Sequence, residues 1–115
     1  MHYNTSIKTW AEEDRPREKL LLKGRSVLSE SELIAIIIGS GNTNQSAVEL
    51  SREILSSVDY SISKLAKLSI EDLMRFNGIG EAKAISIAAA LELGRRKRKE
   101  SASKHLISRN PYQSK

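Results

Sequence analysis

The residues best suited to binding chemistry lie in a short turn between two segments with helical patterns. Residues 73–84 read LMRFNGIGEAKA, so a short apolar segment, the turn Gly78-Ile79-Gly80 and a second segment follow one another directly. Two glycines let the main chain approach another molecule closely. Amide groups at the start of the second helix would face outward along the positive end of its dipole, which suits a phosphate oxygen. This pattern predicts contacts to nucleic-acid phosphates, which position a protein without reading sequence.

The neighbouring side chains fit the same interpretation, and the whole segment resembles the helix-hairpin-helix motif of sequence-independent DNA-binding proteins. We expect Ile79 to point inward and pin the turn to the core. Ala82 and Lys83 belong to the start of the second helix, where Lys83 would reach the same phosphate. Glu81 favours the helix dipole but repels a phosphate at short range, so we expect weak or partner-assisted binding. The alternative is that Gly-Ile-Gly is only a tight corner between helices.

Catalytic and metal chemistry has little support in this sequence. There is no cysteine, which excludes disulfides, thiolate nucleophiles and cysteine-based metal sites, and two isolated histidines, His2 and His105, cannot supply a typical zinc site. No pair of catalytic groups with suitable spacing is visible, so we expect neither an enzyme nor a cofactor. No stretch approaches the roughly 20 apolar residues of a membrane span, and we expect a cytoplasmic protein without a membrane partner.

The net charge of +5 is unevenly distributed along the 115 residues. Residues 1–93 hold 11 basic and 13 acidic side chains, whereas residues 94–115 hold eight basic side chains and one acidic one. Arg95, Arg96 and Lys97 begin this basic segment, and we expect them to assist phosphate binding. The alternative is a solvated spacer, because charge runs usually face solvent.

Helix signals are dense and strand signals are nearly absent, which predicts an all-α fold, a compact bundle of about five to six helices. Residues 33–38 are expected to form a helix that is buried on most sides and stops at Gly39. Another amphipathic helix should end near Ser57. Serine caps precede the predicted helices: Ser29 with Glu32, Ser46 with Glu49, Ser61, and Ser69 with Asp72.

The two ends of the chain set the expected domain boundaries. Pro16 suits a first helical turn and Gly24 would close that helix, whereas Trp10 is expected to pack on the bundle from an N-terminal arm. The longest predicted helix runs over residues 81–98. We therefore expect three regions: an arm at 1–14, a helix-hairpin-helix domain at 15–98 and a basic linker at 99–115.

A faint internal repeat at an offset of 39 residues places Gly39-Ser40-Gly41 on Gly78-Ile79-Gly80. The apolar pairs that support it are Ile34 with Leu73 and Ile37 with Phe76. The upstream copy is degenerate, because a polar serine replaces the pinning isoleucine. We expect a structural mate of the hairpin, in a tandem arrangement, and keep a second phosphate site as the less favoured interpretation.

Several motifs together resemble the N-terminal domain of the bacterial RadC family, over about residues 7–98. The motifs are Ile7-Lys8-x-Trp10, Arg15-Pro16-Arg17-Glu18-Lys19-Leu20-Leu21, Leu28-Ser29-x-x-Glu32-Leu33-Ile34-Ala35-Ile36, Gly78-Ile79-Gly80-x-Ala82-Lys83-Ala84 and Ala90-Leu91-Glu92-Leu93. The resemblance implies a DNA-repair-associated protein whose helical domain precedes a JAB/MPN-type metal-dependent domain. The histidine and aspartate motif of that second domain is not in this sequence, so we expect an excised or truncated N-terminal domain.

Two functions follow as expectations. The first is a non-catalytic, sequence-independent DNA-binding module. The alternative is a protein-interaction or regulatory module that docks on the downstream JAB/MPN domain or on a partner. Arg15 and Arg17 belong to the family signature and invite a DNA-contact interpretation, against an ion pair within the domain with Asp14 or Glu18.

Overall fold

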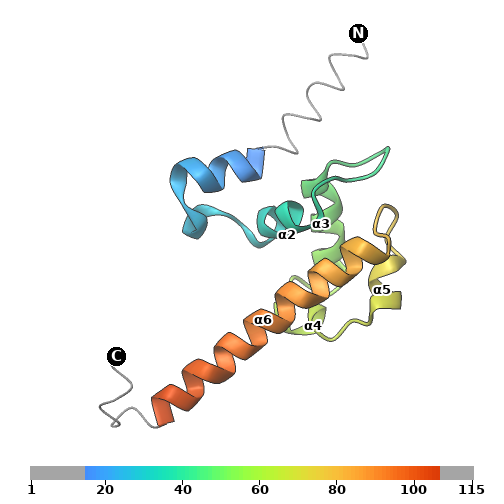
Figure 1. Ribbon diagram of the computed structural model, residues 1–115. Helices are drawn as coiled ribbons and strands as arrows, with labels where there is room; N and C mark the ends of the chain where they lie inside the picture. Colours follow the sequence, from blue (N-terminus) through green and yellow to red (C-terminus); the bar gives the residue numbers. More distant parts are fainter. Residues whose placement is uncertain (1–14, 107–115) are drawn as a thin grey trace.

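The computed structural model describes the backbone of residues 15–106 and the side chains of residues 15–102, and all the regular secondary structure in this part of the chain is helical (Figure 1). A first helix covers residues 15–23. The later elements are η1 (Arg25–Val27), α2 (Glu30–Ile38), α3 (Ala47–Ser56), α4 (Ile62–Leu65), α5 (Ile70–Met74) and α6 (Glu81–Leu106). The predicted all-α fold is confirmed.

Serine side chains begin four of these helices, as predicted. The Ser29 hydroxyl accepts from the Glu32 amide at 3.1 Å, and the Glu32 carboxylate accepts from the Ser29 amide at 2.8 Å. The same reciprocal capping box occurs at Ser46 and Ser69, and Ser61 caps α4. Each cap satisfies amide groups that have no partner within their own helix, so helix starts are fixed locally by sequence.

One hydrophobic core holds the helices together, and α3 lies at its centre. Leu50, Ile54 and Leu55 of α3 are fully buried, and Ala84 and Ile87 of α6 pack against the same cluster. The second half of α6 extends away from this body (Figure 1), and its side chains from residue 93 to residue 102 are exposed. The core therefore fixes the start of α6 and leaves its basic half in solvent.

The predicted burial of residues 33–38 on most sides is wrong. Ile34, Ala35 and Ile38 are buried, but Leu33 and Ile37 are 39% and 36% exposed. The helix exists as predicted, because its capping box and Gly39 set its ends. Its contacts with α3 and α6 cover only part of its surface, so an apolar run here does not mean burial all round.

The long helix differs from the prediction at its C-terminal end. It continues to Leu106, so residues 99–106 of the expected linker are helical. Those residues include lysine, glutamate, alanine and leucine, which favour helices, and contain neither glycine nor proline. The expected arm at 1–14, with Trp10, lies outside the described residues.

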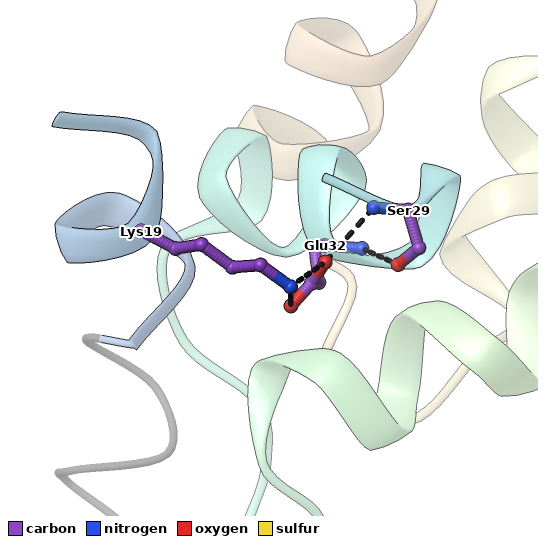
Figure 2. A network of polar contacts seen from close by, with 3 residues as sticks. All are labelled: Lys19, Ser29 and Glu32. Carbon is purple, nitrogen blue, oxygen red and sulfur yellow. Dashed lines mark hydrogen bonds and ion pairs between the residues drawn. The ribbon is translucent and has the colours of Figure 1, made fainter. Parts of the chain in front are cut away.

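A polar network ties the first helix to the start of α2 (Figure 2). The Lys19 ammonium donates to both carboxylate oxygens of Glu32 at 3.2 Å, while the same carboxylate accepts from the Ser29 amide. The Glu32 side chain is only 19% exposed. The pKa of Glu32 lies below its usual value of 4.5, mainly because of the Ser29 amide, with Lys19 contributing, although burial opposes the shift.

This network predicts a pH-dependent contribution to stability. A lowered pKa in the folded state stabilises the fold above the usual value of 4.5, and that contribution disappears as the pH falls through the folded-state pKa. Glu32→Gln keeps a capping side chain but loses the charge, so we expect it to lower the free energy of unfolding at pH 7 by about 1 kcal/mol. In urea denaturation, the gap between wild type and variant should narrow at pH 3.

Glu30→Gln is the matched control, because Glu30 lies in the same first turn, is exposed, and forms no recorded ion pair within the described part of the chain. It should cost less than Glu32→Gln at pH 7. An equal cost of Glu32→Gln at pH 7 and pH 3 would contradict the assigned charge pair.

Candidate functional site

In the turn between α5 and α6, Gly78 and Ile79 both face the inside of the fold. Gly78 has a φ of 103°, which side-chain-bearing residues rarely adopt. A Cβ at Gly78 would lie 3.0 Å from the Cβ of Asn42 and 3.2 Å from a methyl group of Leu50. Ile79 is 4% exposed and belongs to the core, as predicted. The turn is therefore packed tightly on its inner side.

Gly80 lies in a different environment at the outer side of the turn. Its φ lies outside the left-handed region, and a Cβ built on it would meet nothing within 4 Å. The Ala84 amide donates to the Gly80 carbonyl at 3.0 Å, which places Gly80 at the N-cap position of α6. Because glycine has no side chain, it cannot cap the first amides of α6, unlike the serines that cap α2, α3, α4 and α5. The start of α6 is thus open to an approaching molecule.

Lys83 does not extend outward from this helix start. Its ammonium donates to the Ser40 carbonyl at 2.8 Å and to the Ser40 hydroxyl at 3.0 Å, and its side chain is half-buried. This contact joins α6 to the loop that follows α2. Lys83 therefore ties two loops together in this structure, where we expected a direct reach toward phosphate.

The loop at residues 39–46 lies directly beside the α5–α6 turn. The Asn42 amide side chain donates to the Asn77 carbonyl at 2.6 Å and to the Gln45 side-chain oxygen at 2.8 Å. The loop is also closed on itself, because a Cβ at Gly41 would overlap the Gln45 carbonyl. Asn42 was not among the predicted site residues. The four polar residues 42–45, directly after Gly39-Ser40-Gly41, are the sequence feature that could have pointed to it.

The predicted repeat can be compared position by position with these loops. Gly39 and Gly78 both have positive φ, at 80° and 103°. Ile34 and Leu73 are both buried, but Ser40 is exposed where Ile79 is buried. Ser40 also accepts the Lys83 ammonium. The segment Gly39-Ser40-Gly41 thus contacts the start of α6, next to the α5–α6 turn, through Ser40.

The basic residues of α6 divide into paired and outward-facing groups. Arg95 and Arg96 both donate to the Glu92 carboxylate, with nitrogen–oxygen distances of 2.8 to 3.0 Å. Hydrogen bonds from Arg95 and then Arg96 lower the pKa of Glu92 to about 2, so the carboxylate stays charged. Lys97 is exposed and forms no recorded ion pair among the described residues. The two arginines thus share one carboxylate.

The acidic and basic residues that flank the site have distinct positions. Glu81 is exposed in the first turn of α6, and Ala82 beside it is exposed too. Arg15 borders a hollow of about 150 Å³ with Glu32, and Arg17 reaches 3.6 Å from the Cβ position of Gly39. Neither arginine forms an ion pair among the residues with described side chains, and the expected partner Asp14 lies outside them.

No group of three or more His, Cys, Asp or Glu side chains among the described residues is arranged to hold a metal ion. None of the helices described combines the length and apolar character needed to cross a bilayer.

Comparisons with known proteins place the chain among bacterial relatives called UPF0758 protein. The Flavobacterium johnsoniae relative is 59% identical over 95 residues, covering 83% of this chain and 41% of its own length. The Porphyromonas gingivalis relative is 49% identical over 92 residues, covering 79% and 40%. The Clostridioides difficile relative is 45% identical over 96 residues, covering 82% and 41%. The chain thus spans about two-fifths of the length of these relatives.

No solved structure matches the chain. The family model described as UPF0758 N-terminal matches residues 7–85, which include the Lys19–Glu32 network and the α5–α6 turn. That match shows that the chain belongs to the N-terminal domain family of UPF0758, the RadC-like family.

Proposed function

We propose that this chain is a non-catalytic module that binds the phosphate backbone of DNA without reading its sequence. The supporting observation is the open start of α6, where Gly80 is exposed and leaves the first helical amides without a side-chain cap. Free amides at a helix N-terminus, with the dipole behind them, suit a phosphate oxygen. Gly78 and Ile79 hold the turn rigidly beneath them.

The same helix carries the second part of the proposed interface. Arg95 begins the exposed basic segment 14 residues beyond Glu81, a separation of about 21 Å along a helix. Contacts at the start of α6 and at its basic second half would let one rigid element follow the DNA backbone. The resemblance of the family to RadC supports the same direction, because the RadC N-terminal domain is taken to bind DNA through its hairpin.

The charges indicate modest affinity. Glu81 opposes a phosphate at the helix start, and Glu92 offsets part of the charge of Arg95 and Arg96. The Lys83 ammonium donates to Ser40, so it does not point toward a phosphate at the helix start. We therefore expect dissociation constants of about 10⁻⁴ to 10⁻⁶ M, as for nonspecific DNA binding at physiological salt.

Gly80→Ser tests the helix start directly. A serine hydroxyl at the N-cap accepts from an amide of the first turn, so it competes with a phosphate for the same donor. We expect duplex DNA to bind about tenfold more weakly, since a hydrogen bond to a charged group is lost. We also expect thermal stability to be unchanged or slightly raised. Fluorescence anisotropy with labelled duplex and thermal melting measure the two effects.

Gly94→Ala is the control for this experiment, because Gly94 also has open space around its Cβ position and lies on the same helix. It should stabilise α6 without changing DNA affinity. If Gly80→Ser bound duplex as tightly as wild type, the first amides of α6 would not be phosphate ligands.

The salt dependence of DNA binding tests the basic half of α6. If Lys97 neutralises one phosphate, Lys97→Gln should reduce the slope of log K against log salt concentration by about 0.9 for duplex DNA. Lys23→Gln is the control, because Lys23 is an exposed lysine at the end of the first helix. Titrations from low to physiological salt measure both slopes. An unchanged slope for Lys97→Gln would remove that residue from the interface.

A protein-interaction module is the second candidate, and exposed apolar side chains favour it. Leu21, Leu22 and Leu93 are 83%, 74% and 68% exposed. The relatives are more than twice as long as the matched region. We expect the remainder of such a chain to be a JAB/MPN domain, and the helical domain would dock on its surface. Calorimetry with the separately produced downstream domain would show heat of association if this docking occurs.

A further inference from the structure

An open groove of about 480 Å³ lies between α4 and the middle of α6, away from the turn that starts α6. Ile62 of α4 and Leu91 of α6 form part of its walls, and both pack against the hydrophobic core on their inner sides. Ala66, Ala90 and Gly94 also border it. These side chains are small, and a Cβ at Gly94 would meet nothing within 4 Å. The groove therefore has room for apolar side chains of another molecule.

The charged residues of this groove are all of one sign. Lys67, Arg95 and Arg98 line it, and no acidic residue does. Arg95 is partly neutralised by Glu92. Lys67 and Arg98 form no recorded ion pair among the residues with described side chains. Two cations thus remain for a negatively charged ligand on opposite walls, one from the α4 side and one from α6.

We propose that this groove binds an acidic, amphipathic segment of a partner protein, with apolar side chains between Ile62 and Leu91 and carboxylates at Lys67 and Arg98. Amphipathic helices bind apolar grooves through anchors spaced three or four residues apart. The surrounding cations complement a segment that carries Asp or Glu beside those anchors. Single-stranded nucleic acid fits this groove less well, because its walls hold no aromatic ring on which a base can stack.

The test uses two labelled 14-residue helical peptides and the 115-residue chain. Both peptides carry leucines at positions four residues apart. One has glutamates beside the leucines, and the other has lysines at the same positions. Fluorescence anisotropy should show that only the acidic peptide binds. Absence of saturable binding of the acidic peptide up to about 1 mM, or equal binding of both peptides, would overturn the proposal.

A pair of charge reversals on α6 provides the matched comparison. Arg98 lines the groove, whereas the neighbouring Lys97 does not, although both are exposed. We expect Arg98→Glu to weaken the acidic peptide about tenfold, because it removes a partner and adds repulsion, and Lys97→Glu to change it less than about twofold. Equal losses in the two variants would mean general attraction to a basic helix, and would refute the groove as the binding site.

Gly94→Leu fills the groove by a route that does not depend on charge. Leucine favours a helix more than glycine does and has open space at this position, so the variant should fold at least as stably as wild type in thermal melts. We expect it to reduce acidic-peptide affinity about tenfold while duplex DNA binding stays within about twofold. Full peptide binding by a folded Gly94→Leu variant would contradict the proposal. Loss of peptide binding with duplex DNA binding retained would show that the groove acts independently of the proposed DNA site.

Discussion

The contact between the loop at 39–46 and the α5–α6 turn is the constraint on which the rest of the site depends. Gly78 has no room for a side chain against Asn42 and Leu50, and the Asn42 side chain donates to the Asn77 carbonyl. Lys83 adds a second tie through Ser40. Because α6 begins immediately after this turn, these contacts fix its direction and leave Gly80 on the outer side. The sequence suggests Lys83 as a phosphate ligand, but in the structure Lys83 helps to orient α6, whose first amides form the proposed phosphate site.

The family signature has a similar physical basis at the other end of the fold. The segments that contain Lys19 and Glu32 are separated in sequence, but one carboxylate joins them while it also caps α2. The Ser29 amide and, to a lesser extent, the Lys19 ammonium stabilise the charged form of this carboxylate, which lowers its pKa. Arg17 lies close to Gly39, which ends α2. The Lys19–Glu32 ion pair therefore ties the first helix to the start of α2, and the loop that supports the turn follows α2.

The sequence predicted local features better than relations between distant residues. Serine caps, Gly39 as a stop and the inward Ile79 follow from short-range rules, and each is present in the structure. The exposure of Leu33 and Ile37 could not be predicted, because it depends on which faces of α2 meet α3 and α6. The Lys83–Ser40 contact spans 43 residues and uses a side chain with several possible partners. The groove beside Gly94 likewise exists only because α4 approaches α6 after the chain has passed through α5.

These features make α6 more than a connection between two ends of the domain. Its first turn offers amides, its middle borders an apolar groove, and its second half carries exposed cations. Arg95 belongs to two of these surfaces, since it lines the groove and begins the basic segment. On both surfaces, the ion pair with Glu92 partly neutralises the charge of Arg95. An acidic segment in the groove would lower the positive potential along α6, so the two proposed ligands, a protein segment and DNA, would oppose each other through charge even where their contact residues differ.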